Sequence, residues 1–519
     1  MNSLNGFQKL ALQFFPLLAV ALLTCSPSHA AVRLPAIFSQ GMVLQREHNV
    51  PVWGWADPDE RVTVAIAGQK ATAVADADGK WKVVLSPIPV GGPYELQVSG
   101  ANSLVVHDVM VGEVWLCAGQ SNMQLPLEKD ADGKQELAAG VCPGLRLFSV
   151  PKKLSATPQT DSTGKWVECS PATARSFSAL AYFFGKELNA SLKVPVGLID
   201  CSFGGTPIEM WFRRETITKY FDYGNALSDW DKQRATFQEE VKDYDRRLKQ
   251  WQQEADSASK EGSTLAPRPE PLLDPDALKP TAVYSGMVAP LIPFALRGVV
   301  WYQGEANVGH ARRFSQLFPA LVKDWRSLWS QGSGLPWYFV QLPRYAAKPG
   351  SLTYGGWASL RAAQARAVDL LPHTAMAVTI DLQGSGDMHA VNKRAVAHRL
   401  ALLALHDEYR QNVGCQGPAC NSAEILGDRV RLHFTNADGL VPGQGPIDGF
   451  AAADEDGHFH PAQARVEKDS VVVSCQQVKH IAYVRYAWAD NPPARLGNSD
   501  GLPAAPFEAD MWQWNRAGR

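Results

Sequence analysis

Ser121 is the first residue whose type and setting suggest chemistry. It lies in the run Gly-Gln-Ser-Asn-Met at 119–123, directly after the apolar residues 113–118, which predict a buried strand. A hydroxyl at the carboxyl end of a buried strand, beside a glycine that permits a tight turn, is well placed for a nucleophile. The run lacks the Gly-x-Ser-x-Gly elbow of α/β-hydrolases, because position 123 is Met. A helix N-cap remains the alternative interpretation of this serine.

A serine attacks an ester only when a base takes its proton. Asp387 and His389 place a carboxylate and an imidazole on one loop, just before a helix expected to begin near Asn392. His389 could act as the base, while the carboxylate fixes its tautomer and stabilises the imidazolium. A surface aspartate beside a helix-capping histidine is the alternative for the same pair.

Acyl transfer also needs hydrogen-bond donors for the charge that develops on the ester oxygen, each worth about 2.7 to 4 kcal/mol. Two segments could supply them. Residues 202–206, Ser-Phe-Gly-Gly-Thr, follow a predicted strand and contain two glycines whose N–H groups can approach a ligand. Gln303 follows another predicted strand and offers a side-chain amide. A simple turn and a structural glutamine are the alternatives.

These residues need a scaffold that brings strand ends together. From about residue 108, apolar strands such as 196–200 alternate with amphipathic helices such as 393–409. This alternation predicts an α/β domain with a mainly parallel sheet, in which ligands bind beyond the carboxyl ends of the strands. Residues 31–107 and 414–519 show short alternating strands instead, which predict an N-terminal β-sandwich and a C-terminal β unit.

The α/β domain is expected in two parts, residues 108–215 and 280–413, separated by a helical insertion at 216–279. Within the insertion, apolar residues recur at three- and four-residue steps, which predicts an amphipathic helix. These residues are Phe237, Val241, Tyr244, Leu248 and Trp251. The insertion could be a surface decoration or a wall of the substrate cleft, and the sequence leaves both open.

Residues 1–30 have the pattern of a cleaved signal peptide, with an apolar stretch at 14–23 and small residues before Ala31. Lipoprotein anchoring at Cys25 is less favoured because a threonine precedes that cysteine. We therefore predict a secreted or periplasmic protein with no membrane span. Its 50 basic and 52 acidic side chains nearly cancel, so its charge does not favour nucleic acid as a partner.

Removing Cys25 from the eight cysteines leaves seven, so at least one lacks an intramolecular partner. Cys415 and Cys420 are close enough in sequence to close a small disulfide loop, although the alternative of no disulfide remains open. Cys117 and Cys201 lie in apolar strand-like segments and are expected to be buried free thiols.

Four motifs in order resemble the sialate O-acetylesterase-like branch of the SGNH hydrolases, a branch that includes bacterial acetylesterases of xyloglucan. The motifs are the segments 119–123, 202–206, 301–307 and 387–389. Further likeness near both ends of the sequence extends the resemblance over nearly the whole mature chain. It implies a three-layer SGNH-type domain and a carboxylic ester hydrolase that removes acetyl groups from a carbohydrate without a metal or other cofactor.

The resemblance also implies roles for the site residues. Ser121 is the nucleophile and donates its own backbone N–H to the oxyanion, Gly205 (or Gly204) gives a second donor, and Gln303 gives the third. Asn307 is a less favoured substitute for Gln303.

The family's Asp-x-x-His pattern puts the acid at position 386, which is glycine in this chain. Asp387 is therefore our choice for the acid that orients His389, and Asp381 is the reserve.

The predicted partner is an acetylated carbohydrate, and the oligomeric state is not predicted. The signal segment and the 16 tryptophans favour plant hemicellulose, xyloglucan or xylan, or its oligosaccharides, with sialate O-acetyl groups as the alternative. Trp211, Trp301 and Trp357 lie nearest the motifs and could stack on sugars, although core positions are the commoner role. Two other classes stay open: a glycosidase that uses Glu305 with Asp381 or Asp387, and a noncatalytic carbohydrate-binding protein.

Overall fold

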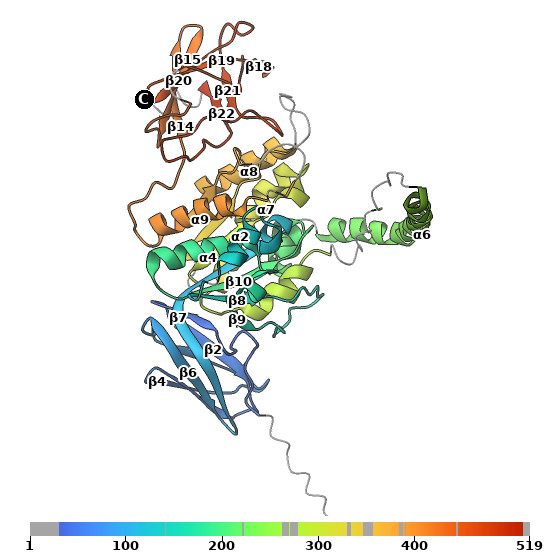
Figure 1. Ribbon diagram of the computed structural model, residues 1–519, viewed down its shortest axis with the longest axis vertical. Helices are drawn as coiled ribbons and strands as arrows, with labels where there is room; N and C mark the ends of the chain where they lie inside the picture. The colour runs from blue at the N-terminus through green and yellow to red at the C-terminus, as the bar shows by residue number, and fades with distance from the viewer. Residues whose placement is uncertain are drawn as a thin grey trace, which may run out of the picture.

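Three parts of the chain follow one another along the long axis of the molecule (Figure 1). The N-terminal strands lie at one end, the C-terminal strands at the other, and a sheet with helices lies between them. The computed structural model describes residues 31–140, 142–220, 223–261, 269, 279–329, 334–345, 356–382, 388–389, 391–442 and 445–511. The predicted signal segment and Asp387 lie outside the described residues.

The central sheet has its strands in the order β13-β12-β11-β7-β10-β8-β9. Neighbours from β13 to β8 pair in parallel, and β9 is antiparallel to β8. Every residue of β11 and β12 is buried, as expected for strands covered on both faces. The strands are β7 (Ser103–Gly119), β8 (Leu145–Ser149), β9 (Trp166–Glu168), β10 (Val196–Ser202), β11 (Gly298–Tyr302), β12 (Trp337–Val340) and β13 (Thr374–Ala377).

Helices cover both faces of this sheet, as the alternation of side chains along β12 shows. Tyr338 stacks with Trp115 of β7, which in turn meets Phe184 of α4 edge-on. The next residue, Phe339, packs against Phe318 of α7, and successive strand residues point to opposite faces. Helix α9 packs with α4, and α8 packs with α7. The helices are α4 (Ala179–Leu192), α7 (Ala311–Leu328), α8 (Gly356–Leu370) and α9 (Lys393–Asp407).

The N-terminal strands form two small sheets, one of β2 with β5 and one of β3, β4 and β6 that continues into β7. The expected boundary at residue 107 falls inside β7, an unbroken strand of 17 residues. The first half of β7 is partly exposed and the second half is fully buried. The pattern of apolar residues therefore changes within a strand whose backbone continues unbroken. The strands are β1 (Val43–Gln45), β2 (Val50–Trp55), β3 (Arg61–Ile66), β4 (Gln69–Val74), β5 (Lys80–Leu85) and β6 (Gly91–Ser99).

The C-terminal strands also form two sheets, in the orders β14-β15-β20-β19-β16 and β18-β17-β21-β22. They enclose a hydrophobic core of their own, with Tyr486 fully buried inside it. The strands are β14 (Ala419–Leu426), β15 (Arg429–Thr435), β16 (Gly445–Ile447), β17 (Phe450–Ala453), β18 (His460–Pro461), β19 (Gln463–Glu467), β20 (Ser470–Ser474), β21 (Tyr483–Tyr486) and β22 (Phe507–Asp510).

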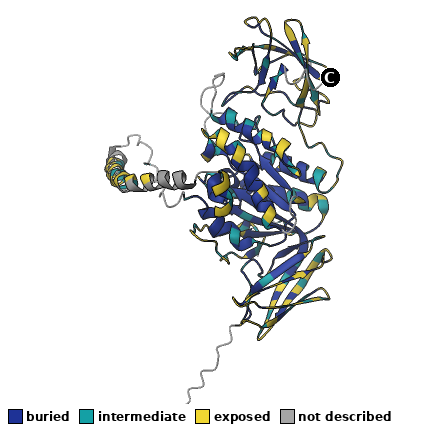
Figure 2. Cartoon of the chain, turned by 180° about the vertical axis from the view of Figure 1, so that it is seen from behind, coloured by how far each residue is buried: buried dark blue, intermediate teal, exposed yellow. Residues whose placement is uncertain are grey.

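Two helices occupy the segment expected to be an insertion. Helix α5 (Arg214–Tyr220) packs on α7, whereas α6 (Tyr223–Glu261) projects away from the central part, as Figure 2 shows from behind. The predicted apolar stripe of α6 is half-buried at each of its five positions, from Phe237 to Trp251. No described helix is long and apolar enough to cross a membrane.

Shorter helices connect the main elements. They are α1 (Ser121–Gln124), η1 (Leu127–Lys129), α2 (Gly133–Ala139), α3 (Pro171–Ala174), η2 (Ile208–Trp211), η4 (Tyr284–Val288), η5 (Ala289–Leu291) and η6 (Glu305–Asn307).

The cysteines are free thiols throughout the described part of the chain. Cys415 and Cys420 form no disulfide, which decides between the two alternatives that the sequence left open. Cys117 and Cys201 are fully buried thiols, as predicted from their strands.

Candidate active site

The turn between β7 and α1 brings Ser121 to the carboxyl edge of the sheet. Gly119 ends the strand with φ +136°, and the Gln120 N–H donates to Tyr302 O at 2.9 Å. A side chain at position 119 would put Cβ only 2.1 Å from Tyr302 O. Only glycine therefore lets the ends of β7 and β11 approach so closely, and this approach places Ser121 as the first residue of α1.

The structure brings Ser121 and His389 together across 268 residues of sequence. Ser121 Oγ and His389 Nε2 lie 2.9 Å apart, within the range for direct proton transfer. His389 lies just before α9, whose N-cap Asn392 accepts the Ala395 N–H. A serine hydroxyl hydrogen-bonded to an imidazole is the pair needed for an activated nucleophile.

The two candidate acids have different surroundings. Asp387, two positions before His389, lies outside the described residues. Both oxygens of Asp381 accept from Arg399, each at 2.7 Å, in a bidentate ion pair. This ion pair gives the reserve acid a separate structural function, because it neutralises a largely buried guanidinium.

The two glycines in the loop after β10 differ in whether their N–H groups are already hydrogen-bonded. The Gly204 N–H donates to Gln124 Oε1 at 2.7 Å, so this donor is already used. Gly205 adopts φ +77° with open space around it, and its N–H has no acceptor among the described residues. The backbone N–H of Ser121 also has no acceptor among the described residues. Gly205 is thus better suited than Gly204 to bind an oxyanion.

Gln303 is fully buried and its amide is already engaged. Nε2 donates to Asn307 Oδ1 at 2.7 Å and to Thr206 O at 3.3 Å, while Oε1 has no partner among the described residues. The amide of Asn307 in turn donates to Glu209 Oε2 and accepts the Ile208 N–H, each at 2.9 Å. Asn307 therefore holds Gln303 in place through its amide oxygen, while its amide nitrogen is bonded to Glu209.

Three residues beneath the pair were not recognised as a unit from the sequence. Asn122, Glu305 and Lys393 are joined by buried side-chain hydrogen bonds. The available signal was weak, since polar residues beside a nucleophile and a catalytic loop can equally face solvent. As a glycosidase carboxylate, Glu305 would face the sugar. Its carboxylate instead accepts a hydrogen bond from Asn122, the residue after Ser121.

The tryptophans near the motifs belong to the core. Trp211 and Trp301 are 0% and 1% exposed, and both pack edge-on or tilted against Trp325. Trp357 is also buried, against Tyr345. None of these three rings offers a free face for a sugar.

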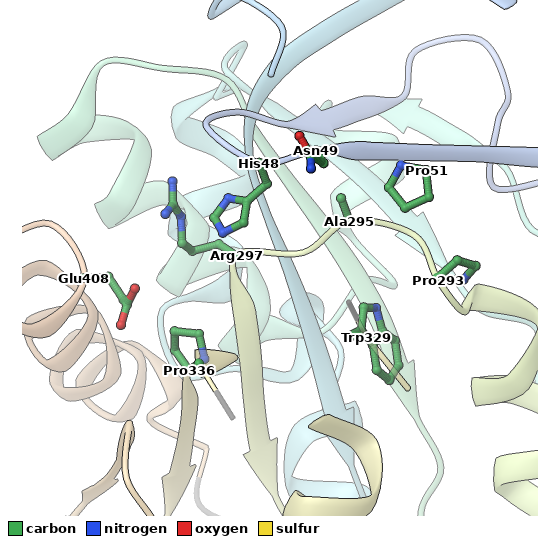
Figure 3. Close-up of a pocket in the computed structure, with 10 residues that line it drawn as sticks. His48, Asn49, Pro51, Pro293, Ala295, Arg297, Trp329, Pro336 and Glu408 are labelled. Carbon is green, nitrogen blue, oxygen red and sulfur yellow. The ribbon is translucent and has the colours of Figure 1, made fainter. Parts of the chain in front are cut away.

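A cavity of about 400 Å³ lies at the other end of the sheet (Figure 3). Arg297 and Pro336, which directly precede β11 and β12, line it together with His48 and Glu408. Because β11 and β12 run parallel with β7, the amino ends of these strands lie opposite the edge where Ser121 follows β7. This cavity is therefore separate from the Ser121–His389 pair.

One group of described side chains has donor atoms close enough to hold a metal ion. The donor atoms of His406, Asp407 and Cys415 all lie within 4.8 Å of one another. His406 is near the far end of α9, about 20 Å from Lys393 at 1.5 Å per helical residue. The group is therefore no part of the Ser121–His389 site.

The fold and the site geometry define an α/β protein with a hydrogen-bonded serine–histidine pair at the carboxyl edge of a mainly parallel sheet. Comparison with known proteins identifies the family. A family model for carbohydrate esterases, sialic acid-specific acetylesterases, matches residues 111–262. Sialate O-acetylesterase from Mus musculus is 30% identical over 92% of this chain and 94% of its own, and that from Homo sapiens is 30% identical over 78% and 76%.

A crystal structure of a carbohydrate acetylesterase from Xanthomonas citri also superposes on this chain. Its TM-score is 0.77 and its sequence identity 37%, covering 93% of this chain and all of that one. The chain belongs to the sialate O-acetylesterase family of carbohydrate esterases. It is a carboxylic ester hydrolase that acts as a carbohydrate O-acetylesterase.

Proposed function

We propose that Ser121 is the nucleophile of this acetylesterase and that His389 is its general base. The observation that carries the assignment is the 2.9 Å contact between Ser121 Oγ and His389 Nε2. His389 takes the hydroxyl proton as Ser121 Oγ forms a bond with the acetyl carbonyl carbon. The tetrahedral intermediate then breaks its bond to the sugar oxygen, which leaves with the proton from His389.

Hydrolysis of the acetyl-enzyme repeats these steps with water. His389 accepts a proton from the water as its oxygen attacks the acetyl carbonyl, and then returns the proton to Ser121 Oγ. Acetate is released and the free serine is restored. We assign to Asp387 the orientation of the imidazole and the stabilisation of the imidazolium.

The oxyanion is bound by the backbone N–H groups of Ser121 and Gly205 and by the side chain of Gln303. The two backbone donors have no acceptor among the described residues, which favours this role. For Gln303, the hydrogen directed at Thr206 O is the available one, because that contact is long at 3.3 Å. Such bonds commonly rearrange when the reacting complex forms.

For the substrate, we propose acetyl esters of plant hemicellulose, xyloglucan or xylan, or of their oligosaccharides. The near balance of acidic and basic side chains suits a neutral saccharide. O-acetylated sialic acid is the second candidate, because two relatives with 30% identity are sialate O-acetylesterases. The predicted signal segment supports action outside the cytoplasm, in the periplasm or as a secreted enzyme.

The test is acetate release by wild type and Ser121→Ala. The substrates are a small aryl acetate, acetylated xyloglucan, acetylated xylan and O-acetyl sialic acid. We expect Ser121→Ala to lower kcat by about 10⁶-fold, down to the rate that binding and the oxyanion donors sustain. The wild-type rates rank the sugars. Equal rates of acetate release by the two proteins would refute the nucleophile assignment and would require another group to attack the acetyl carbonyl.

A further inference from the structure

Asn122 follows the nucleophile and its side chain is fully buried. Its amide nitrogen donates to Glu305 Oε1 at 2.5 Å and to the Met388 carbonyl at 2.9 Å. Its amide oxygen accepts from Lys393 Nζ at 2.5 Å. All three directions of the amide are therefore used, and two of them lead to the segment that carries His389.

The chemistry of these partners fixes the orientation of the amide. A lysine ammonium can only donate and a main-chain carbonyl can only accept. The oxygen of Asn122 must therefore face Lys393, and its nitrogen must face Met388. Turning the amide over would break both contacts and leave buried polar groups unpaired, which is unfavourable.

The two charged partners lie on opposite sides of the amide. Burial raises the pKa of the Glu305 carboxyl, while the hydrogen bond from Asn122 and the charges of Lys393 and His389 lower it. Lys393 is completely buried and its Nζ also lies 5.2 Å from the centre of the Tyr302 ring. A buried amide that bonds to an ammonium on one side and a carboxyl on the other is held more rigidly than one in water, because the bond from Lys393 is charge-assisted and water does not compete for these groups.

The attachments bracket the catalytic base. Met388 directly precedes His389, and Lys393 is four residues after it. The Lys393 backbone N–H is fixed in turn by Asp130 Oδ2 at 2.7 Å. The side chain of Asn122, on the helix that begins at Ser121, is thus hydrogen-bonded to the chain on both sides of His389.

We propose that Asn122 is a positioning residue that fixes His389 Nε2 against Ser121 Oγ by tying the base segment to the nucleophile helix, with Glu305 and Lys393 orienting its amide. This inference rests on the proposed roles of Ser121 and His389. The side chain of Asn122 is fully buried, so it acts through His389 and not on the substrate directly. Its effect on rate comes from geometry, since a displacement of about 1 Å at a reacting pair can cost about 100-fold in rate.

The first test is Asn122→Asp, which keeps the size of the side chain but replaces its donor with an acceptor. The new oxygen faces the Met388 carbonyl and Glu305, so the tie to the base segment is lost. We expect kcat for an aryl acetate to fall about 10- to 100-fold with KM changed less than about twofold. The rate at which a fluorophosphonate labels Ser121 should fall by a similar factor, because labelling depends on the same Ser121–His389 geometry.

Asn498 in the C-terminal β unit provides a matched control. It is also buried, donates to the carbonyls of Gln416 and Asn436 at 3.0 and 3.2 Å, and accepts the Leu502 N–H at 3.1 Å. Asn498→Asp makes the same chemical change away from the site. It should lower the thermal midpoint while leaving kcat and the labelling rate as in wild type.

A double variant separates positioning from stability. In Asn122→Asp with Glu305→Gln, the glutamine can donate to the new carboxylate, which removes the repulsion between two buried carboxylates. Folding should recover, as judged by near-UV circular dichroism and thermal midpoint. The bond to the Met388 carbonyl stays lost, so kcat and the labelling rate should stay low.

Recovery of kcat together with stability in the double variant would overturn the positioning role, as would wild-type labelling of Asn122→Asp. The single variant could fail to fold, and the double variant then carries the test alone. Failure of the proposed function looks different, because Ser121→Ala would then hydrolyse the acetate as fast as wild type whatever residue stands at position 122.

Discussion

At the scale of single residues, the site depends on which hydrogen bonds are already taken. The Gly204 N–H is held by Gln124, whereas the N–H groups of Ser121 and Gly205 have no acceptor among the described residues. Both oxygens of Asp381 are held by Arg399. A donor or acceptor held by a short hydrogen bond contributes to the fold first, which favours Gly205 over Gly204 as a donor and gives Asp381 a structural role.

The choice between the two acids gives a first prediction. Asp387→Asn should lower kcat by about 10⁴-fold, because an amide holds His389 in the wrong tautomer. Asp381→Asn is the matched control. It should lower the thermal midpoint, since it leaves Arg399 without its counter-charge, but change kcat less than about threefold. Steady-state hydrolysis of an aryl acetate and thermal unfolding measure the two effects, and the opposite pattern would make Asp381 the acid.

The role proposed for Gln303 as third oxyanion donor gives a second prediction. Gln303→Leu keeps the approximate volume of the side chain but removes its amide hydrogens, so kcat should fall about 100- to 1,000-fold. KM should change little, because the donor acts on charge that develops in the transition state. A loss of less than about threefold, with the protein folded, would limit Gln303 to supporting the loop at Thr206.

At the scale of elements, the ends of β7, β10 and β11 bring the site together, and β10 also carries a half-buried acid. Asp200 lies near its end with Oδ1 shielded from solvent. Burial raises the pKa of Asp200 to about 7, although Ser202 and Lys152 oppose this rise. The folded protein therefore keeps this carboxyl protonated over a pH range in which the unfolded chain releases the proton.

This shift sets a pH dependence of stability with a definite sign. A carboxyl whose folded pKa is raised favours the folded state below its ordinary pKa, and that contribution is lost as pH rises from about 4 to about 7. Asp200→Asn removes the ionisable group that causes this loss of stability. We expect its thermal midpoint to exceed that of wild type by about 2 to 4 °C or more at pH 8, and the difference to shrink at pH 5. A constant difference between pH 5 and pH 8 would contradict the raised pKa.

At the scale of the whole molecule, the two β units relate differently to the central sheet. The N-terminal strands share β7 with it and belong to the same hydrophobic core, whereas the C-terminal strands have their own core. Helix α6 leaves the central part sideways, and its apolar stripe is only half-buried (Figure 2). The sheet edge that carries Ser121 is therefore formed by the central sheet, including the strand that it shares with the N-terminal unit.

Removal of α6 gives the prediction at this scale. Replacing residues 223–261 with a short Gly-Ser linker, while keeping α5 on α7, should leave kcat/KM for an aryl acetate within about twofold of wild type. The reason is that no element of the Ser121–His389 site lies on α6. Acetate release from acetylated xyloglucan is the second measurement. A decrease confined to the polymer would make α6 a wall of the substrate cleft, and a decrease for both substrates would contradict its independence from the site.

The sequence alone determined the features that depend on local order. The apolar runs predicted the strands and the places where they end. The motifs at 119–123 and 387–389 gave Ser121 and His389 as the candidate pair. The resemblance to a family of carbohydrate esterases followed from the same motifs. The sequence could not locate a boundary inside β7, because a change from a half-exposed to a buried sheet alters side chains without interrupting the strand.

Only the tertiary structure decided which polar groups meet. Asn122 finds its partners 183, 266 and 271 positions away, and Ser121 finds His389 268 positions away. No local pattern encodes such pairings, because they arise when parallel strands align their carboxyl ends and bury the side chains between them. Burial then requires every donor and acceptor to find a partner. The same requirement makes Asp381 a partner of Arg399 and keeps Gln303 bonded to Asn307. Ser121 and Gly205 are not buried, and their N–H groups have no acceptor among the described residues, which suits them to bind an oxyanion.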